Sequence, residues 1–97
     1  MRRVLHGDVR AAARALLAVA PEARDGLLLR LFAEAEAADA HRLATGRAHP
    51  LFGTGSLMSA ALGHRVAREP YLDDPAYADC MARVFDALVA RAGQGGA

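Results

Sequence analysis

The sequence lacks lysine, isoleucine and asparagine, contains a single cysteine, and is only 5% aromatic over its 97 residues. Its hydrophobic fraction of 54% consists mostly of alanine and leucine, which are strong helix formers. Composition therefore favours helices over strands. The chain is long enough to bury one modest core and too short for two, so we expect one domain.

These absences also exclude several kinds of chemistry. A Walker-type phosphate loop needs a strand, then glycines, then a lysine, whereas the glycine-rich residues 53–56 follow a predicted helix in a chain without lysine. The single cysteine, Cys80, cannot form an internal disulfide, and its place beside an apolar helical stripe is typical of a buried, unreactive thiol. The histidines never have the spacing of three or four residues that places two metal ligands on one helical face; they are His6, His41, His49 and His64. We expect no enzymatic activity, no metal and no cofactor.

The sequence also has no long uncharged run. Charged residues interrupt the N-terminal segment, which excludes a signal peptide, and no apolar stretch is long enough to cross a membrane. Together with the single cysteine, this predicts a soluble, cytoplasmic protein.

Periodic apolar residues and capping residues predict two helices in the first half of the chain. The first spans residues 8–19, with Asp8 as its N-cap. The second begins at Pro21 and ends at about residue 44, because Gly46 is a natural C-terminal stop. At 1.5 Å per residue it is about 36 Å long, the longest element of the chain.

Two further helices follow the glycine-rich residues. Thr54 or Ser56 can cap a short third helix, and Asp74 followed by proline begins a fourth, which we expect to stop at Gly93. The prediction is a compact all-α fold of four helices. Residues 1–92 form the single helical domain, and residues 93–97 form a glycine-rich, flexible tail.

The long helix has two separate apolar faces. The broader one is predicted to enter the core and carries Leu27, Leu28, Leu31, Phe32, Ala35 and Ala38. The second is a seam of small residues with a heptad-like spacing of four, three and four: Ala33, Ala37, Ala40 and Ala44. Either a second copy of the chain packs against this seam, giving a homo-oligomer, or the seam is an alanine-rich surface exposed to solvent.

Charge alternates along the chain. Residues 1–20 and 45–68 are net basic, residues 21–44 and 69–97 are net acidic, and the whole chain carries only +1. Two interpretations are open. In the first, neighbouring segments pair internally. In the second, the arginines gather on one surface and bind phosphate; these are Arg2, Arg3, Arg10, Arg14, Arg47, Arg65 and Arg68.

Residues 47–56 are the best candidate for an anion site. They combine a fixed cation at Arg47, a titratable ring at His49 and N–H groups at the start of the third helix. The same residues also describe an ordinary capped connection between helices. Our hypothesis for contacts to DNA or phosphate comprises Arg2, Arg3, Arg10, Arg14, Arg47 and His49.

Three blocks of the sequence carry a resemblance. The opening MRRVLHGDV, the block ATGRAHPLFGTGSLMSAAL and the end EPYLDDPAYADCMARVFDALVAR resemble a family of short alphaproteobacterial proteins of the Rhodobacter-like group. The chain also resembles the small terminase subunit of phage-like gene transfer agents. Small terminases are helical proteins that assemble into rings, bind DNA and present it to the large terminase subunit, which holds the ATPase and nuclease activities.

The resemblance implies a DNA-packaging accessory protein, with a large terminase subunit as its protein partner and weak, non-specific DNA binding. An alternative of a different class is a small helical interaction or regulatory module that docks a protein and has no role with nucleic acid.

Overall fold

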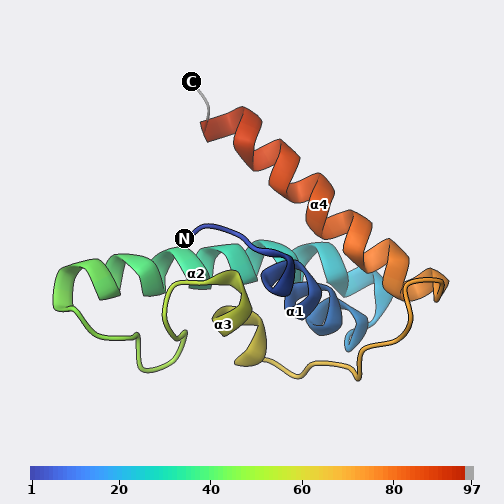
Figure 1. The fold of residues 1–97 in the computed structure, drawn as a ribbon, viewed down its shortest axis with the longest axis horizontal. Coiled ribbons are helices and arrows are strands. Elements are labelled where there is room, and N and C mark those ends of the chain that lie inside the picture. The colour runs from blue at the N-terminus through green and yellow to red at the C-terminus, as the bar shows by residue number, and fades with distance from the viewer. Residues whose placement is uncertain (96–97) are drawn as a thin grey trace.

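The structure is a computed structural model that describes residues 1–95. Its elements are α1 (His6–Leu17), a 3₁₀ turn η1 (Pro21–Ala23), α2 (Arg24–Thr45), α3 (Leu57–Leu62) and α4 (Pro75–Gly95). Figure 1 shows α2 as a long horizontal helix, α1 and α3 beside it, and α4 rising diagonally away from the other helices. No strand forms within these residues, which confirms the predicted all-α fold.

The first helix is the centre of the core. Four alanines and Leu16 of α1 are fully or almost fully buried, and α1 contacts α2, α3 and α4. Alanine side chains allow other helices to approach closely, so a short helix can be surrounded on several sides. The largest buried side chains around it are Phe32 and Leu31 from α2, Leu57 from α3, and Tyr77 from α4.

The start of α1 differs from the prediction. The helix begins at His6, two residues before the expected N-cap, and Leu5 takes the capping position. Asp8 lies inside the first turn, where its Oδ2 accepts a hydrogen bond from the N–H of Leu5 at 2.8 Å. The acidic side chain therefore still caps the helix, but from the third helical position, as the acidic partner of a capping box does.

The second helix follows the prediction closely. Pro21 opens a 3₁₀ turn that leads into α2, and Gly46 ends the helix in the left-handed conformation with φ of +74°. Leu28, Leu31, Phe32, Ala35 and Ala38 are buried, which confirms the core-facing side. The alanine seam Ala33, Ala37, Ala40 and Ala44 is exposed on the opposite side of the helix.

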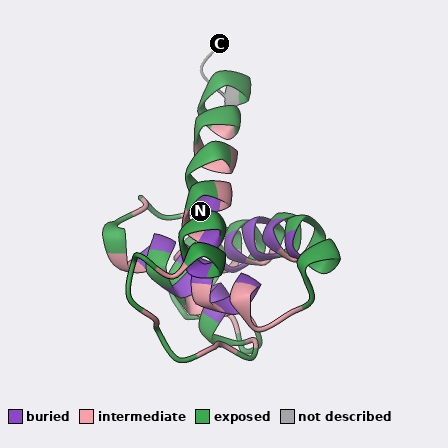
Figure 2. Cartoon of the chain, turned by 90° about the vertical axis from the view of Figure 1, so that its right-hand side faces the viewer, coloured by how far each residue is buried: buried purple, intermediate pink, exposed green. Residues whose placement is uncertain are grey.

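The fourth helix begins as predicted and ends later. Asp74 caps it through Oδ1, which accepts the N–H of Tyr77 at 3.0 Å. Gly93 does not stop the helix, which continues to Gly95, because Gly93 is not in the positive-φ conformation that a glycine stop requires. The last two positions of the predicted tail, 96–97, lie outside the described residues. Figure 2 shows the second half of α4 projecting from the other helices, with mostly exposed residues.

Candidate nucleic-acid interface

His49 organises the loop between α2 and α3. Its Nδ1 accepts hydrogen bonds from the N–H groups of Leu51 and Phe52, at 3.0 and 3.1 Å. The ring stacks on Phe52 at 4.7 Å between centroids and meets His41 edge-on at 5.1 Å. A ring nitrogen that accepts two N–H groups carries no proton. His49 is thus engaged within its own loop, and its Nδ1 is not available to an anion.

The glycines of this loop permit close packing. Gly53 and Gly55 have φ of +84° and +96°, in the left-handed region that favours glycine. A Cβ at Gly55 would lie 2.7 Å from the Cα of Asp39 on α2, and a Cβ at Gly53 would lie 2.3 Å from Oγ of Ser59 on α3. The loop therefore needs glycine where it presses against α2 and α3, and this accounts for the glycine-rich sequence without a phosphate.

Two of the N–H groups at the start of α3 are hydrogen-bonded within the protein, which favours the capped connection over the anion site. The N–H of Met58 donates to Oδ1 of Asp8 at 2.8 Å, and the N–H of Ser59 donates to Oγ of Ser56 at 3.0 Å. Ser56 is therefore the N-cap of α3. This confirms one of the two predicted alternatives, Thr54 or Ser56. The carboxylate of Asp8, carried by α1, occupies the position that an external anion would take at this helix start.

Arg2 and Arg3 lie beside this same helix start. The N–H of Arg2 donates to the carbonyl of Gly55 at 2.9 Å, which fixes the N-terminal segment along the loop. The terminal amino group of Met1 pairs with Asp39 at 3.2 Å. Both arginine side chains are exposed and border a groove of about 580 Å³ that Ser56 and Met58 also line.

Arg10 and Arg14 hold the chain segment between α3 and α4 against α1. Arg10 forms a two-pronged pair with Glu69, with N–O distances of 2.6 and 2.7 Å, and Tyr77 donates to the same carboxylate at 2.8 Å. These hydrogen bonds, that of Arg10 foremost, lower the pKa of Glu69 from 4.5 to about 2. Nε of Arg14 donates to the carbonyl of Ala67 at 2.9 Å.

Some arginines are thus paired with carboxylates, and others have no side-chain partner among the described residues. Four of them form ion pairs with carboxylates: Arg10, Arg42, Arg83 and Arg91. Within residues 1–95, side-chain hydrogen bonds and ion pairs are absent for Arg2, Arg3, Arg30, Arg47, Arg65 and Arg68.

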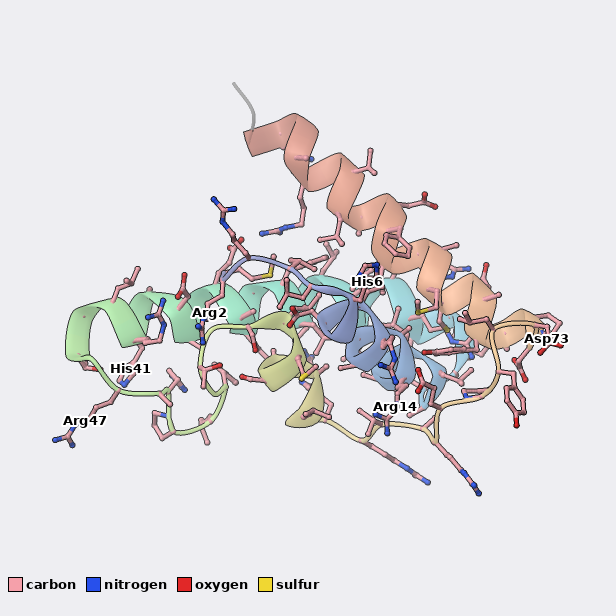
Figure 3. All side chains as sticks on the ribbon, in the orientation of Figure 1. Arg2, His6, Arg14, His41, Arg47 and Asp73 are labelled. Carbon is pink, nitrogen blue, oxygen red and sulfur yellow. The ribbon has the colours of Figure 1, made fainter. Side chains whose placement is uncertain are left out.

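The unpaired arginines do not form one compact cluster. Figure 3 shows Arg47 at the far end of α2, pointing away from the protein, and Arg2 closer to α3. Arg47, Arg65 and Arg68 belong to the two loops that follow the lower edge in Figure 1, and no acidic residue occurs in residues 45–68. Three of the six unpaired arginines therefore belong to loops along one edge of the protein.

Other candidate reactive groups are engaged or enclosed. Cys80 is fully buried, and this burial raises the pKa of its thiol. Nε2 of His64 lies 2.7 Å from Oε1 of Glu34, linking the segment after α3 to α2. Among the residues described, no three histidine, cysteine or acidic side chains come together as metal ligands would, and no helix has the length and apolar character needed to span a bilayer.

Residues 2–88 match a family described as a domain of unknown function (DUF7742), and the chain belongs to that family. No curated protein and no solved structure matches the chain.

Proposed function

We propose that the protein is a non-enzymatic, cytoplasmic accessory protein for DNA packaging, similar to a small terminase. In this role it self-associates, binds DNA weakly and without sequence preference, and presents the DNA to a large terminase subunit. The observation that carries the proposal is the set of exposed, unpaired arginines on two loops that contain no acid before Glu69.

The chemistry of these arginines suits a phosphate backbone. A guanidinium offers several N–H donors in a fixed fork that matches two phosphate oxygens, and it remains charged at any physiological pH. Arg47, Arg65 and Arg68 are exposed, and none of them forms an ion pair with a carboxylate among the described residues. Arg2 and Arg3 add two further exposed cations. Because the whole chain carries only +1, we expect binding that is weak and readily lost in salt.

Self-association is the second part of the proposal. The seam formed by Ala33, Ala37, Ala40 and Ala44 is fully available, because it faces away from the core side of α2. Small side chains at this spacing allow a helix of a second copy to approach closely.

Salt titrations of DNA binding test the role with nucleic acid. Fluorescence anisotropy of a labelled duplex is measured for the wild type, Arg47→Ala and Arg68→Ala at several salt concentrations. We expect each variant to weaken binding to all sequences alike and to lower the slope of log K against log salt by about one, since each removes one phosphate contact. Arg30→Ala, on the exposed surface of α2 away from these loops, is the charge-matched control and should leave the slope unchanged.

The interaction module without nucleic acid remains a second candidate, favoured by a different observation. A groove of about 420 Å³ lies between α1, the segment before α4, and α4 itself. Its rim includes Tyr71 and Leu72, which are 87% and 67% exposed although both are apolar over most of their surface. Failure of the wild type to bind DNA at low salt, or equal binding by all variants, would favour this candidate.

A further inference from the structure

The segment between α3 and α4, residues 63–74, forms neither helix nor strand, yet its middle is fixed to the protein. Figure 1 shows it running from α3 along the lower edge to the start of α4. The N–H of Ala67 donates to the carbonyl of Arg14 on α1 at 3.0 Å, and the carbonyl of Ala67 accepts Nε of the same arginine at 2.9 Å. The neighbouring Val66 packs against the hydrophobic core.

The segment is also attached on either side of this point. Before it, Nε2 of His64 lies 2.7 Å from Oε1 of Glu34 on α2. After it, the carboxylate of Glu69 is held by Arg10 on α1 and by the hydroxyl of Tyr77 on α4. Contacts with all three longer helices therefore fix the path of the backbone.

Tyr71 stands on this fixed backbone with its side chain in solvent. The ring of Pro70 restricts the backbone before it, and the N–H of Asp74 closes a turn on the carbonyl of Tyr71 at 3.1 Å. The side chain of Tyr71 is 87% exposed, whereas Tyr77, the other tyrosine, is fully buried. Among the described residues, no ring stacks on Tyr71 and no arginine lies over it. The faces of this ring are thus open to a ligand.

Two unpaired cations share the segment with this ring. Arg65 and Arg68 are exposed, and neither has a side-chain hydrogen bond or ion pair within residues 1–95. A hollow of about 570 Å³ borders both a cation and the ring; it is lined by Arg68, Glu69, Pro70 and Tyr71. Because Arg10 balances the charge of Glu69, Arg68 keeps its positive charge for a ligand.

An open ring beside free guanidinium groups matches the chemistry of an unpaired nucleotide. A base stacks its flat face on an exposed aromatic ring, and a guanidinium binds the phosphate. A peptide side chain offers a ring or an acid, whereas every nucleotide joins a base to a phosphate. Bases inside a duplex are already stacked and paired, so the ring reaches a base face only where the strand is single.

We infer that residues 65–71 bind single-stranded DNA, with a base stacked on Tyr71 and phosphates held by Arg65 and Arg68. The inference rests on the DNA binding of the proposed function and names the form of DNA that this surface takes. Since the backbone is fixed before the strand arrives, little conformational entropy is lost on binding.

An exposed acid sets the direction of the strand. Asp73 follows Tyr71 at the turn into α4, as Figure 3 shows, and it forms no ion pair among the described residues. Its charge repels phosphate. The strand therefore runs from the ring toward Arg65 and away from α4.

The experiment compares a single strand with a duplex. Fluorescence anisotropy is measured with labelled oligothymidine, longer than the roughly 20 Å that residues 65–71 can span, and with a blunt duplex. We expect Tyr71→Ala to weaken binding of the single strand by about 10-fold or more and to leave the duplex unchanged. Tyr71→Phe keeps the ring and should bind as the wild type does. Leu72→Ala, which removes the neighbouring exposed apolar side chain, is the matched control and should also bind normally.

Salt dependence separates stacking from phosphate contacts. Arg65→Ala and Arg68→Ala should each lower the slope of log K against log salt for the single strand by about 0.7. Tyr71→Ala should lower the affinity without changing the slope, because the ring is neutral. A slope that falls in Tyr71→Ala, or a Leu72→Ala variant that loses as much affinity, would show displacement of the segment and overturn the stacking.

Tyrosine fluorescence reports the ring directly. The chain has two tyrosines and no tryptophan, so the emission that Tyr71→Phe lacks belongs to Tyr71. Oligothymidine should quench this part of the emission. Thymidine monophosphate at the same concentration of bases should quench it far less, since one nucleotide does not reach both arginines. Equal quenching would indicate a site for free nucleotides and overturn the binding of a strand.

The outcomes distinguish this inference from the proposed function. A wild type that binds the duplex but not the single strand overturns the inference and leaves the proposed function intact. Binding of neither form at low salt overturns both. Single-strand binding that is unchanged in Tyr71→Ala also overturns the stacking, whatever the duplex titrations give.

Discussion

Replacing Asp8 tests the contact that joins the two halves of the fold. Its side chain is buried on α1, and it accepts one N–H from Leu5 and another from Met58, each at 2.8 Å. The contact to Met58 spans 50 positions of the sequence and fixes the start of α3 against the start of α1. The substitution Asp8→Ala removes both acceptors and leaves two donors with no partner in the protein.

The size of the expected destabilisation follows from these two hydrogen bonds. A hydrogen bond to a charged group contributes about 1.5 to 3 kcal/mol to stability. When the acceptor is removed, an N–H that remains accessible to water bonds to water instead, and this recovers part of the lost stability. Leu5 is largely exposed, so the greater part of the cost comes from Met58. We expect Asp8→Ala to lower the free energy of unfolding by about 2 to 4 kcal/mol. At about 4 to 8 °C per kcal/mol for a domain of this size, the Tm falls by about 10 °C or more.

Thermal and urea unfolding followed by circular dichroism measure the change. Asp8→Asn retains one acceptor oxygen and should lose about half as much stability as Asp8→Ala. Asp86→Ala, an exposed acid on α4 with no ion pair in the described residues, is the control and should stay within about 0.5 kcal/mol of the wild type. If Asp8→Ala is as stable as this control, Asp8 does not cap α3, and the start of that helix is again open to an external anion.

Two other predictions concern stability. Because Arg10 holds the pKa of Glu69 at about 2, below its ordinary 4.5, the stabilisation from this pair is complete above pH 4.5 and disappears as the pH falls toward 2. The difference in Tm between the wild type and Glu69→Gln should therefore shrink over that range, and a constant difference would contradict the pairing. Gly55→Ala should cost about 1 to 3 kcal/mol in urea unfolding, because the residue has φ of +96° and its Cβ would press on Asp39. Gly26→Ala, in a helical position with no atom within 4 Å of the added Cβ, should instead stabilise the protein by about 0.5 to 1 kcal/mol. If both alanine variants changed the free energy of unfolding equally, the loop would not require glycine at position 55.

The sequence predicted those parts of the fold that depend on neighbouring residues. Gly46 ends α2 and Asp74 caps α4 because each acts on backbone groups within a few positions of itself. The core side of α2 was equally predictable, since burial follows helical periodicity. Gly93 was misjudged because glycine permits a helix stop without requiring one.

The parts that could not be predicted depend on contacts between distant positions. Asp8 has the residue type and the position typical of an N-cap. Nothing in the neighbouring sequence indicates that its side chain also accepts a hydrogen bond from the N–H of Met58. The pairing of Arg10 with Glu69 joins positions 59 apart, and the alternating charge left open whether the arginines pair internally or gather on one surface. For His49, the direction of the ring and the N–H groups around Nδ1 decide its role, and these emerge only from the folded loop.

The paired and unpaired arginines have linked roles in the proposed DNA interaction. Arg14 and Arg10 fasten the segment that carries Arg65 and Arg68, through the carbonyl of Ala67 and the carboxylate of Glu69. Substituting Arg10 would therefore release the segment on which the free arginines lie, as well as remove one positive charge. Weaker DNA binding in such a variant would not identify a phosphate contact at Arg10, because displacement of the segment predicts the same result. Arg68→Ala avoids this ambiguity, because Arg10 and Arg14 still hold the segment in place, and it should lower the slope of log K against log salt by about one.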